Sequence, residues 1–199
     1  GTNYLMGWSY DDTAEARGFN PVFGVGITRC FNPKWSLYGG IQYGSVAGLK
    51  ASQKTFSSKT FDFGYNSIDT IVNTKQLYYV VIPVQLHYHF NNRNSIGIGG
   101  SLSYLVNTKS DIAINSMSGN SLMTTVSQKN KMGYYAGAFK QWDASVAVVY
   151  RRRISEKFSV SASANYGLFD IKNDTFFSRR KFERNIGVKI IFSYDLFQF

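Results

Sequence analysis

The stretch Phe158-Ser-Val-Ser-Ala-Ser-Ala-Asn-Tyr-Gly-Leu168 alternates between apolar residues and polar or very small ones. In an extended chain, one face would carry Phe, Val, Ala, Ala, Tyr and Leu, and the other face Ser, Ser, Ser, Asn and Gly. Successive side chains of a β-strand point to opposite faces, so this period of two predicts a strand with one apolar and one small, polar face.

The same division of faces recurs along the chain, and no convincing apolar stripe at helical spacing interrupts it. We therefore predict an all-β protein. The predicted strands are 3–10, 22–31, 35–44, 77–90, 95–105, 142–154, 158–168 and 184–196.

The connections between these strands alternate in length. Three are short, at 32–34, 91–94 and 155–157, and the others are long and polar, at 11–19, 50–75, 106–141 and 172–183. This alternation predicts antiparallel strands with short turns at one end and long loops at the other.

Alternation alone fits a soluble β-sandwich as well as a membrane barrel, because both architectures share that period. The aromatic residues favour the barrel: pairs such as Phe23 and Phe31, or Trp142 and Tyr150, bracket apolar rows eight residues long. Eight residues at about 3.3 Å each, tilted by roughly 40°, rise about 20 Å, near the height between the two aromatic girdles of a membrane barrel. The predicted girdle is Phe23, Phe31, Trp35, Tyr43, Tyr88, Tyr104, Trp142, Tyr150, Phe158, Tyr166 and Tyr194.

We thus predict one domain over residues 1–199, an eight-stranded antiparallel up-and-down transmembrane β-barrel. Its inward face is rich in Gly and Ser, which suits a barrel whose interior is only wide enough for side chains, so a conducting pore is not expected.

The composition agrees with this class of protein. The chain has 199 residues, 44% hydrophobic and 17% aromatic, and no stretch approaches the roughly 18 apolar residues of a membrane-spanning helix. Cys30 is the single cysteine, so a disulfide framework is excluded. The formal charge of +10 is scattered over many segments; in an outer membrane its natural partner is lipopolysaccharide phosphate. The chain begins at Gly1 without Met, which we interpret as a mature or excised piece.

Three local motifs resemble a known family. Tyr79-Val-Val-Ile-Pro83 resembles the Tyr-x-x-Ile-Pro pattern of the PorT-like outer-membrane β-barrels of Bacteroidetes-type bacteria, and the resemblance extends to Gly24–Gly26 and to the aromatic end Phe197-Gln-Phe199. It implies a Gram-negative outer-membrane protein. Relatives of this type occur as free-standing barrels, as parts of a secretion apparatus, and as carboxyl-terminal domains of anti-sigma factors that span both membranes.

Several polar side chains share the inward face of the predicted strands. His87 and His89 lie two residues apart, a spacing that could hold zinc or copper with a third ligand; we favour a hydrogen-bond network with Gln85 and expect neither metal nor cofactor. Pro83 cannot donate to a ladder and should mark a bulge or a local break. The strand directions place Asp195 at the short-turn end with Arg153. The predicted interior network is Gln85, His87, His89, Asp143, Arg151, Arg153, Lys189 and Asp195.

The long loops combine basic and aromatic residues, which can bind anionic sugars, phosphates or a partner protein, or can simply solvate the loops and contact lipid phosphates. The candidates are Lys59, Phe61, Tyr134, Tyr135, Phe176, Phe177, Arg179 and Arg180.

These features predict a non-enzymatic barrel that acts as a surface sensor or anchor, with the anti-sigma type of trans-envelope signalling as one form. A free-standing structural or secretion-associated barrel is the alternative. A lipid-modifying enzyme is disfavoured because no Gly-x-Ser-x-Gly elbow occurs. Single-stranded nucleic acid is not expected as a partner, because the strand aromatics accompany Val, Ile and Leu instead of interleaving with Lys or Arg.

Overall fold

The computed structural model describes residues 2–13, 16–47, 66–118, 121–133, 139–170, 184 and 186–197. In these ranges the chain forms the strands β1 Thr2–Thr13, β2 Ala16–Asn32, β3 Trp35–Ala47, β4 Asn66–His89, β5 Asn94–Ser118, β6 Ser121–Met132, β7 Trp142–Arg153, β8 Phe158–Gly167 and β9 Ile186–Phe197. Among the described residues there is no helix long and apolar enough to cross a membrane.

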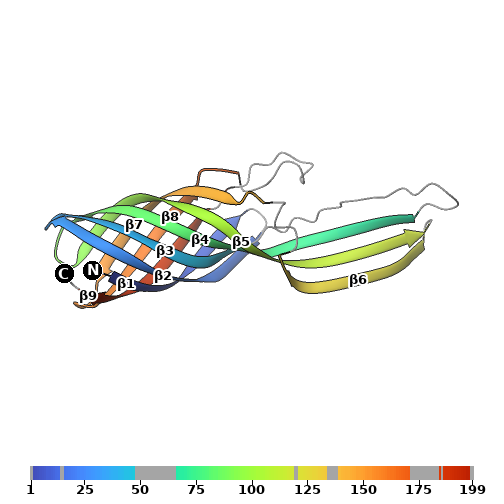
Figure 1. The fold of residues 1–199 in the computed structure, drawn as a ribbon, viewed down its shortest axis with the longest axis horizontal. Helices are drawn as coiled ribbons and strands as arrows, with labels where there is room; N and C mark the ends of the chain where they lie inside the picture. The colour runs from blue at the N-terminus through green and yellow to red at the C-terminus, as the bar shows by residue number, and fades with distance from the viewer. Residues whose placement is uncertain are drawn as a thin grey trace.

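Eight of the strands pair in a cyclic order. The sheet runs β4-β3-β2-β1-β9-β8-β7-β5, and an additional β4–β5 pairing joins the two ends. All of these pairings are antiparallel. Figure 1 shows them wound into one elongated body with both chain ends at the short-turn end. The eight predicted strands and their antiparallel direction are therefore confirmed, and β6 is a ninth strand that the sequence did not predict.

The strands are staggered around this order. The stagger can be followed by moving from Thr2 on β1 to its register partner on the next strand, and so on through the other seven strands. The last partner, on β9, lies one position beyond the partner of Asp11, so the path returns to β1 about ten residues from where it began. Stagger and tilt are linked in a barrel, and the strands accordingly run obliquely in Figure 1. Because the stagger is even, inward positions of one strand stay next to inward positions of its neighbour.

The two faces of the strands differ as the alternation predicts. Large apolar side chains lie outside and are open, with Ile27 63% and Ile98 64% exposed. So many exposed apolar side chains on one surface are unusual for a protein in water and indicate an apolar surrounding. The buried inward side chains include many small or polar ones, among them Ser36, Gln42, His87, Ser95, Asp143, Ser159, Ser163, Ser193 and Asp195.

Pro83 interrupts one ladder, as predicted. It lies opposite Ser101 on β5, but on the other side the β3–β4 partners pass from Gly39↔Val84 directly to Gln42↔Val81. The missing N–H of proline accounts for a break on one side only.

Two of the predicted loops were wrong in part. In the segment 50–75, β4 already begins at Asn66, and in the segment 106–141, β5 continues to Ser118 and β6 follows from Ser121. β6 pairs with β5 outside the ring of eight strands. β4, β5 and β6 thus project together beyond the barrel as a three-stranded sheet (Figure 1). These segments are polar and lack a continuous apolar face, which is the pattern of a loop, yet hydrogen bonding between strands does not require such a face.

Candidate functional site: the polar interior and the projecting sheet

The interior is packed around Tyr38, which points inward from β3 and is 6% exposed. Two glycines make room for its ring. A Cβ atom at Gly26 would lie 2.4 Å from Tyr38 Cε2, and one at Gly40 would lie 2.7 Å from the Tyr38 hydroxyl oxygen. Both distances are far below van der Waals contact, so only glycine fits at these positions while Tyr38 keeps its place.

Gln85 and His87 are neighbours on the inward face of β4. His87 Nε2 is hydrogen bonded to Gln85 Oε1 at 3.2 Å, and a Cβ at Gly97 would lie 2.8 Å from His87 Nδ1. His89 Nε2 is hydrogen bonded to Ser36 Oγ at 2.7 Å. The two histidines therefore have separate polar partners, one on β4 itself and one on the neighbouring β3. Among the residues described, no three His, Cys, Asp or Glu side chains come together as a metal site would need.

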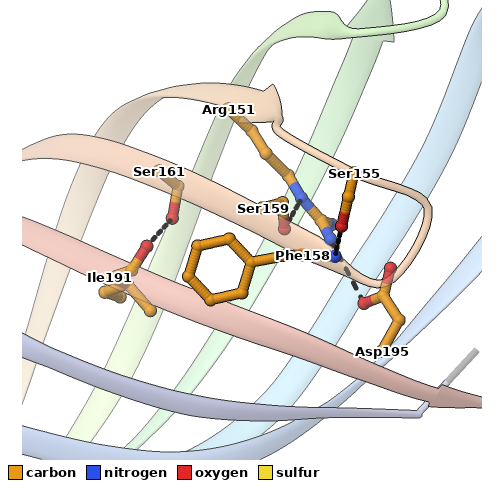
Figure 2. Close-up of polar contacts among 7 residues, drawn as sticks. All are labelled: Arg151, Ser155, Phe158, Ser159, Ser161, Ile191 and Asp195. Carbon is orange, nitrogen blue, oxygen red and sulfur yellow. Dashed lines mark hydrogen bonds and ion pairs between the residues drawn. The ribbon is translucent and has the colours of Figure 1, made fainter.

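Arg151 points inward from β7 and extends along the inner wall toward the next two strands, β8 and β9. Its Nε donates to Ser159 Oγ at 3.1 Å, and its Nη2 lies 3.5 Å from Asp195 Oδ1. Figure 2 shows the guanidinium group between these two partners, which come from β8 and β9. The side chains are only 18% and 9% exposed, and charges withdrawn from water to this extent need a partner of opposite sign.

The other predicted network residues lie apart from this pair. Arg153 ends β7 with its side chain exposed at the rim, so Arg151, and not Arg153, is the partner of Asp195. The backbone N–H of Arg153 donates to the carbonyl oxygen of Arg93 in the neighbouring turn, which places Arg153 at the edge of the ring. Lys189 is half-buried on β9, and Asp143 is buried at the far end of β7.

A small cavity remains between these side chains. Its volume is about 30 Å³, and Tyr38, Gln85, His87, Arg151 and Ser163 are among its lining residues. That volume holds one or two water molecules, which polar walls of this kind commonly bind. The interior at this level therefore consists of side chains, with space for water between them.

The predicted girdle residues lie on the outward face. Trp35 packs edge-on against Tyr88 with ring centroids 5.1 Å apart, near the short turns, and Tyr104 packs against Trp142 at 4.8 Å, near the opposite end. Phe23, Phe31, Tyr43, Tyr150, Tyr166 and Tyr194 are exposed, and Phe158 is half-exposed.

The eight loop candidates, Lys59, Phe61, Tyr134, Tyr135, Phe176, Phe177, Arg179 and Arg180, lie outside the described residues. Sequence reasoning missed the projecting sheet, although Ser118-Gly119-Asn120 is a turn signal between two runs of strand-forming residues. The β5–β6 hairpin turns there, with Ser118 opposite Ser121.

Comparison with known proteins gave a family match and likenesses of fold. Residues 9–173 match the family described as "Outer membrane protein beta-barrel domain". No match was found among curated proteins.

Among solved structures, the chain is similar to Neisserial surface protein A (NspA), with 12% identity, coverage of 98% of this chain and 96% of that chain, and a TM-score of 0.51. It is also similar to Ail, the attachment invasion locus protein of Yersinia pestis, with 13% identity, coverage of 98% and 97%, and a TM-score of 0.42. At these identities the likeness to NspA speaks for a shared fold alone.

Proposed function

The chain belongs to the outer membrane protein beta-barrel domain family and is a protein of the bacterial outer membrane, and from this we propose that it crosses that membrane as a closed eight-stranded barrel. The cyclic pairing of eight strands supports this proposal, since closure removes every unpaired edge from the apolar layer. The exposed apolar side chains on the outer wall, with aromatic side chains toward both ends, are the surface that lipid requires.

A closed membrane barrel should resist unfolding by detergent. We expect the purified protein to migrate differently in electrophoresis with and without boiling, and to give a β-rich circular dichroism spectrum in detergent. A protein that stays soluble without detergent and shows no difference on boiling would contradict the membrane barrel.

We further propose that the barrel is a non-enzymatic surface sensor, and that the projecting sheet of β4, β5 and β6 is its recognition element. The single observation that carries this proposal is the continuation of these strands beyond the ring, because a rigid wall then holds a long hairpin away from the membrane. Lys109, Lys129 and Lys140 give this end basic charge, which suits lipopolysaccharide phosphate or an anionic surface partner. His87 and His89 face the interior with Gln85 and Ser36 as partners, which favours a structural role over lipid chemistry.

Signalling across the envelope, of the anti-sigma type found in Bacteroidetes, is the form of sensing that we propose. The resemblance of Tyr79–Pro83 to the PorT-like pattern supports it. The ends of β1 and β9 also lie side by side, with Thr2 opposite Phe197, at the end away from the hairpin. Any chain attached there would lie on the opposite side of the membrane from the hairpin.

The hairpin can be shortened without touching the ring. Ile112 and Gln128 are register partners, so replacing 113–127 by Asn-Gly joins them through a two-residue turn. In the native bacterium, we expect this variant to change the same transcripts as deletion of the whole gene. If the shortened protein is present at the parental level, still shows the boiling-dependent shift and leaves transcription unchanged, the sensor is wrong and a passive anchor or structural barrel remains.

A labelling control fixes the orientation that this test assumes. On intact cells, a membrane-impermeant maleimide should label a Thr124→Cys variant made in a Cys30→Ser background, because residue 124 lies on β6. The parental Cys30, exposed near the short turns, should react only after the outer membrane is opened. The reverse pattern would place the hairpin in the periplasm and contradict surface recognition.

A further inference from the structure

The short-turn end carries a fixed set of basic residues. Each of its three turns contains one cation whose carbonyl oxygen accepts a hydrogen bond from a neighbouring strand: Lys34 from His89 N at 2.7 Å, Arg93 from Arg153 N at 2.7 Å, and Lys157 from Asp195 N at 2.8 Å. The backbone of each cation is therefore held at the rim of the barrel.

The backbones of three arginines meet at one of these turns. Arg93 lies in the turn, and the next residue, Asn94, is the register partner of Arg152. The backbone N–H of Arg153 donates to the carbonyl oxygen of Arg93. The turn itself is rigid, because Asn91 Oδ1 accepts hydrogen bonds from Arg93 N at 2.9 Å and Asn94 N at 2.7 Å.

The cluster lies at the edge of the lipid-facing wall. Arg152 shares its outward face with Tyr150, two residues away, and Tyr150 donates from its hydroxyl to Asn94 Oδ1 at 2.8 Å. An aromatic side chain with its polar tip toward such a turn is typical of the level where lipid tails meet headgroups. Arg152 lies one step beyond that level, where the phosphates of the adjacent leaflet are found.

The charges of the cluster are not neutralised within the described part of the chain. Arg93, Arg152 and Arg153 are exposed or at the rim, and none makes an ion pair with a described residue, since Asp195 is the partner of Arg151. Arg152 points outward and Arg153 points toward the inner rim, so together with Arg93 they give this turn a concentration of positive charge on both sides of the strand end, which attracts an anion. Guanidinium groups are also well shaped to bind phosphate oxygens in pairs.

We propose that Arg93 and Arg152, beside Asn94 and Tyr150, form a binding site for the phosphate of an anionic phospholipid in the leaflet at the short-turn end, with Arg153 adding positive charge from the inner rim. An acidic segment of a soluble protein is the other partner that charge alone would allow. The lipid is favoured because Arg152 faces outward along the membrane wall, where a soluble partner does not reach. This proposal rests on the membrane placement proposed above, and it concerns the end opposite to the recognition hairpin.

The test is native mass spectrometry of the whole protein, released from detergent in the presence of phosphatidylglycerol or phosphatidylcholine. We expect the parental protein to retain phosphatidylglycerol in preference to phosphatidylcholine. The triple variant Arg93→Gln, Arg152→Gln, Arg153→Gln should lose that preference, with binding weakened by roughly tenfold or more. The triple Arg→Lys variant keeps the charge but not the paired donors, and should bind with intermediate strength.

The matched control removes three exposed cations of the same end that lie outside this turn, with Arg29→Gln, Lys34→Gln and Lys157→Gln, and should leave the retained phosphatidylglycerol unchanged. Equal losses in the two triple Gln variants would mean attraction by net charge alone and would overturn the site. Retention in the arginine variant would overturn it too, in favour of a soluble acidic partner. The boiling-dependent shift, measured for each variant, separates the membrane-barrel proposal from the lipid-site proposal. If no protein shows the shift, the barrel is contradicted. If the proteins show it, the lipid measurements test the binding site alone.

Discussion

Replacing Gly40 by alanine is expected to lower the free energy of unfolding by about 2 kcal/mol, in the range measured for overpacked interiors. The added Cβ would lie 2.6 Å from the carbonyl oxygen of Val25 and 2.7 Å from the Tyr38 hydroxyl. The first contact is with the backbone of the adjacent strand, which can yield only by moving the wall. Urea unfolding in a fixed detergent or lipid, followed by the boiling-dependent shift, measures the change.

The next residue along β3 provides the control. A Cβ at Gly39 meets nothing closer than the carbonyl oxygen of Pro83 at 4.0 Å, so Gly39→Ala should change stability by less than about 0.5 kcal/mol. Made in a Tyr38→Ala background, Gly40→Ala should cost less than it does in the parental protein but should still destabilise, since the Val25 contact remains. Equal effects of Gly39→Ala and Gly40→Ala would show that glycine is not required at Gly40 by the space around it.

The second large effect is expected when Asp195 is replaced by asparagine. This leaves the buried guanidinium of Arg151 without its counter-charge, and breaking a buried pair in this way costs about 3 kcal/mol or more. The unfolding midpoint in urea should fall accordingly, with the unboiled form converting to the boiled form at a lower temperature.

Two further variants test whether stability falls because a charge is left unpaired in the interior or because a charge is removed. The double variant Arg151→Met, Asp195→Leu removes both charges and should be less destabilised than Asp195→Asn, because no unpaired charge stays inside. Arg29→Met removes an exposed cation near the same end and should have little effect. A double variant less stable than Asp195→Asn would mean that the pair contributes mainly through packing.

The ring of eight strands could be predicted from sequence because its physical cause is local. In a strand that lies between lipid and a narrow interior, apolar residues have to alternate with small ones. Segments such as 35–44 and 158–168 show this alternation along their length. The break at Pro83 was predictable for the same reason, since the missing N–H belongs to proline itself.

The extension of β4, β5 and β6 could not be predicted in this way. Beyond the apolar layer neither face of a strand has to be apolar, so residues 107–118 have the composition of a loop while they form a strand. Pairing between backbones carries no pattern in the side chains, and only the turn signal at 118–120 pointed to it.

The sequence predicts which polar residues face the interior, but it does not predict which of them pair with one another. The sequence places Arg151, Arg153 and Asp195 on the inward face, yet the pairing of Arg151 with Asp195 depends on the stagger between β7, β8 and β9. That stagger is a property of the assembled ring. The loop candidates stay a prediction.

The position of β6 outside the ring has a consequence for how this protein can diversify. Lengthening or exchanging the β5–β6 hairpin alters neither the strand number nor the stagger, and these two quantities set the diameter of the wall. With the function proposed above, assembly and recognition belong to separate parts of one chain. Related proteins can therefore differ in the molecules that the hairpin contacts while the strands of the ring insert into the membrane in the same way. A protein engineer can graft a foreign epitope onto the hairpin for the same reason.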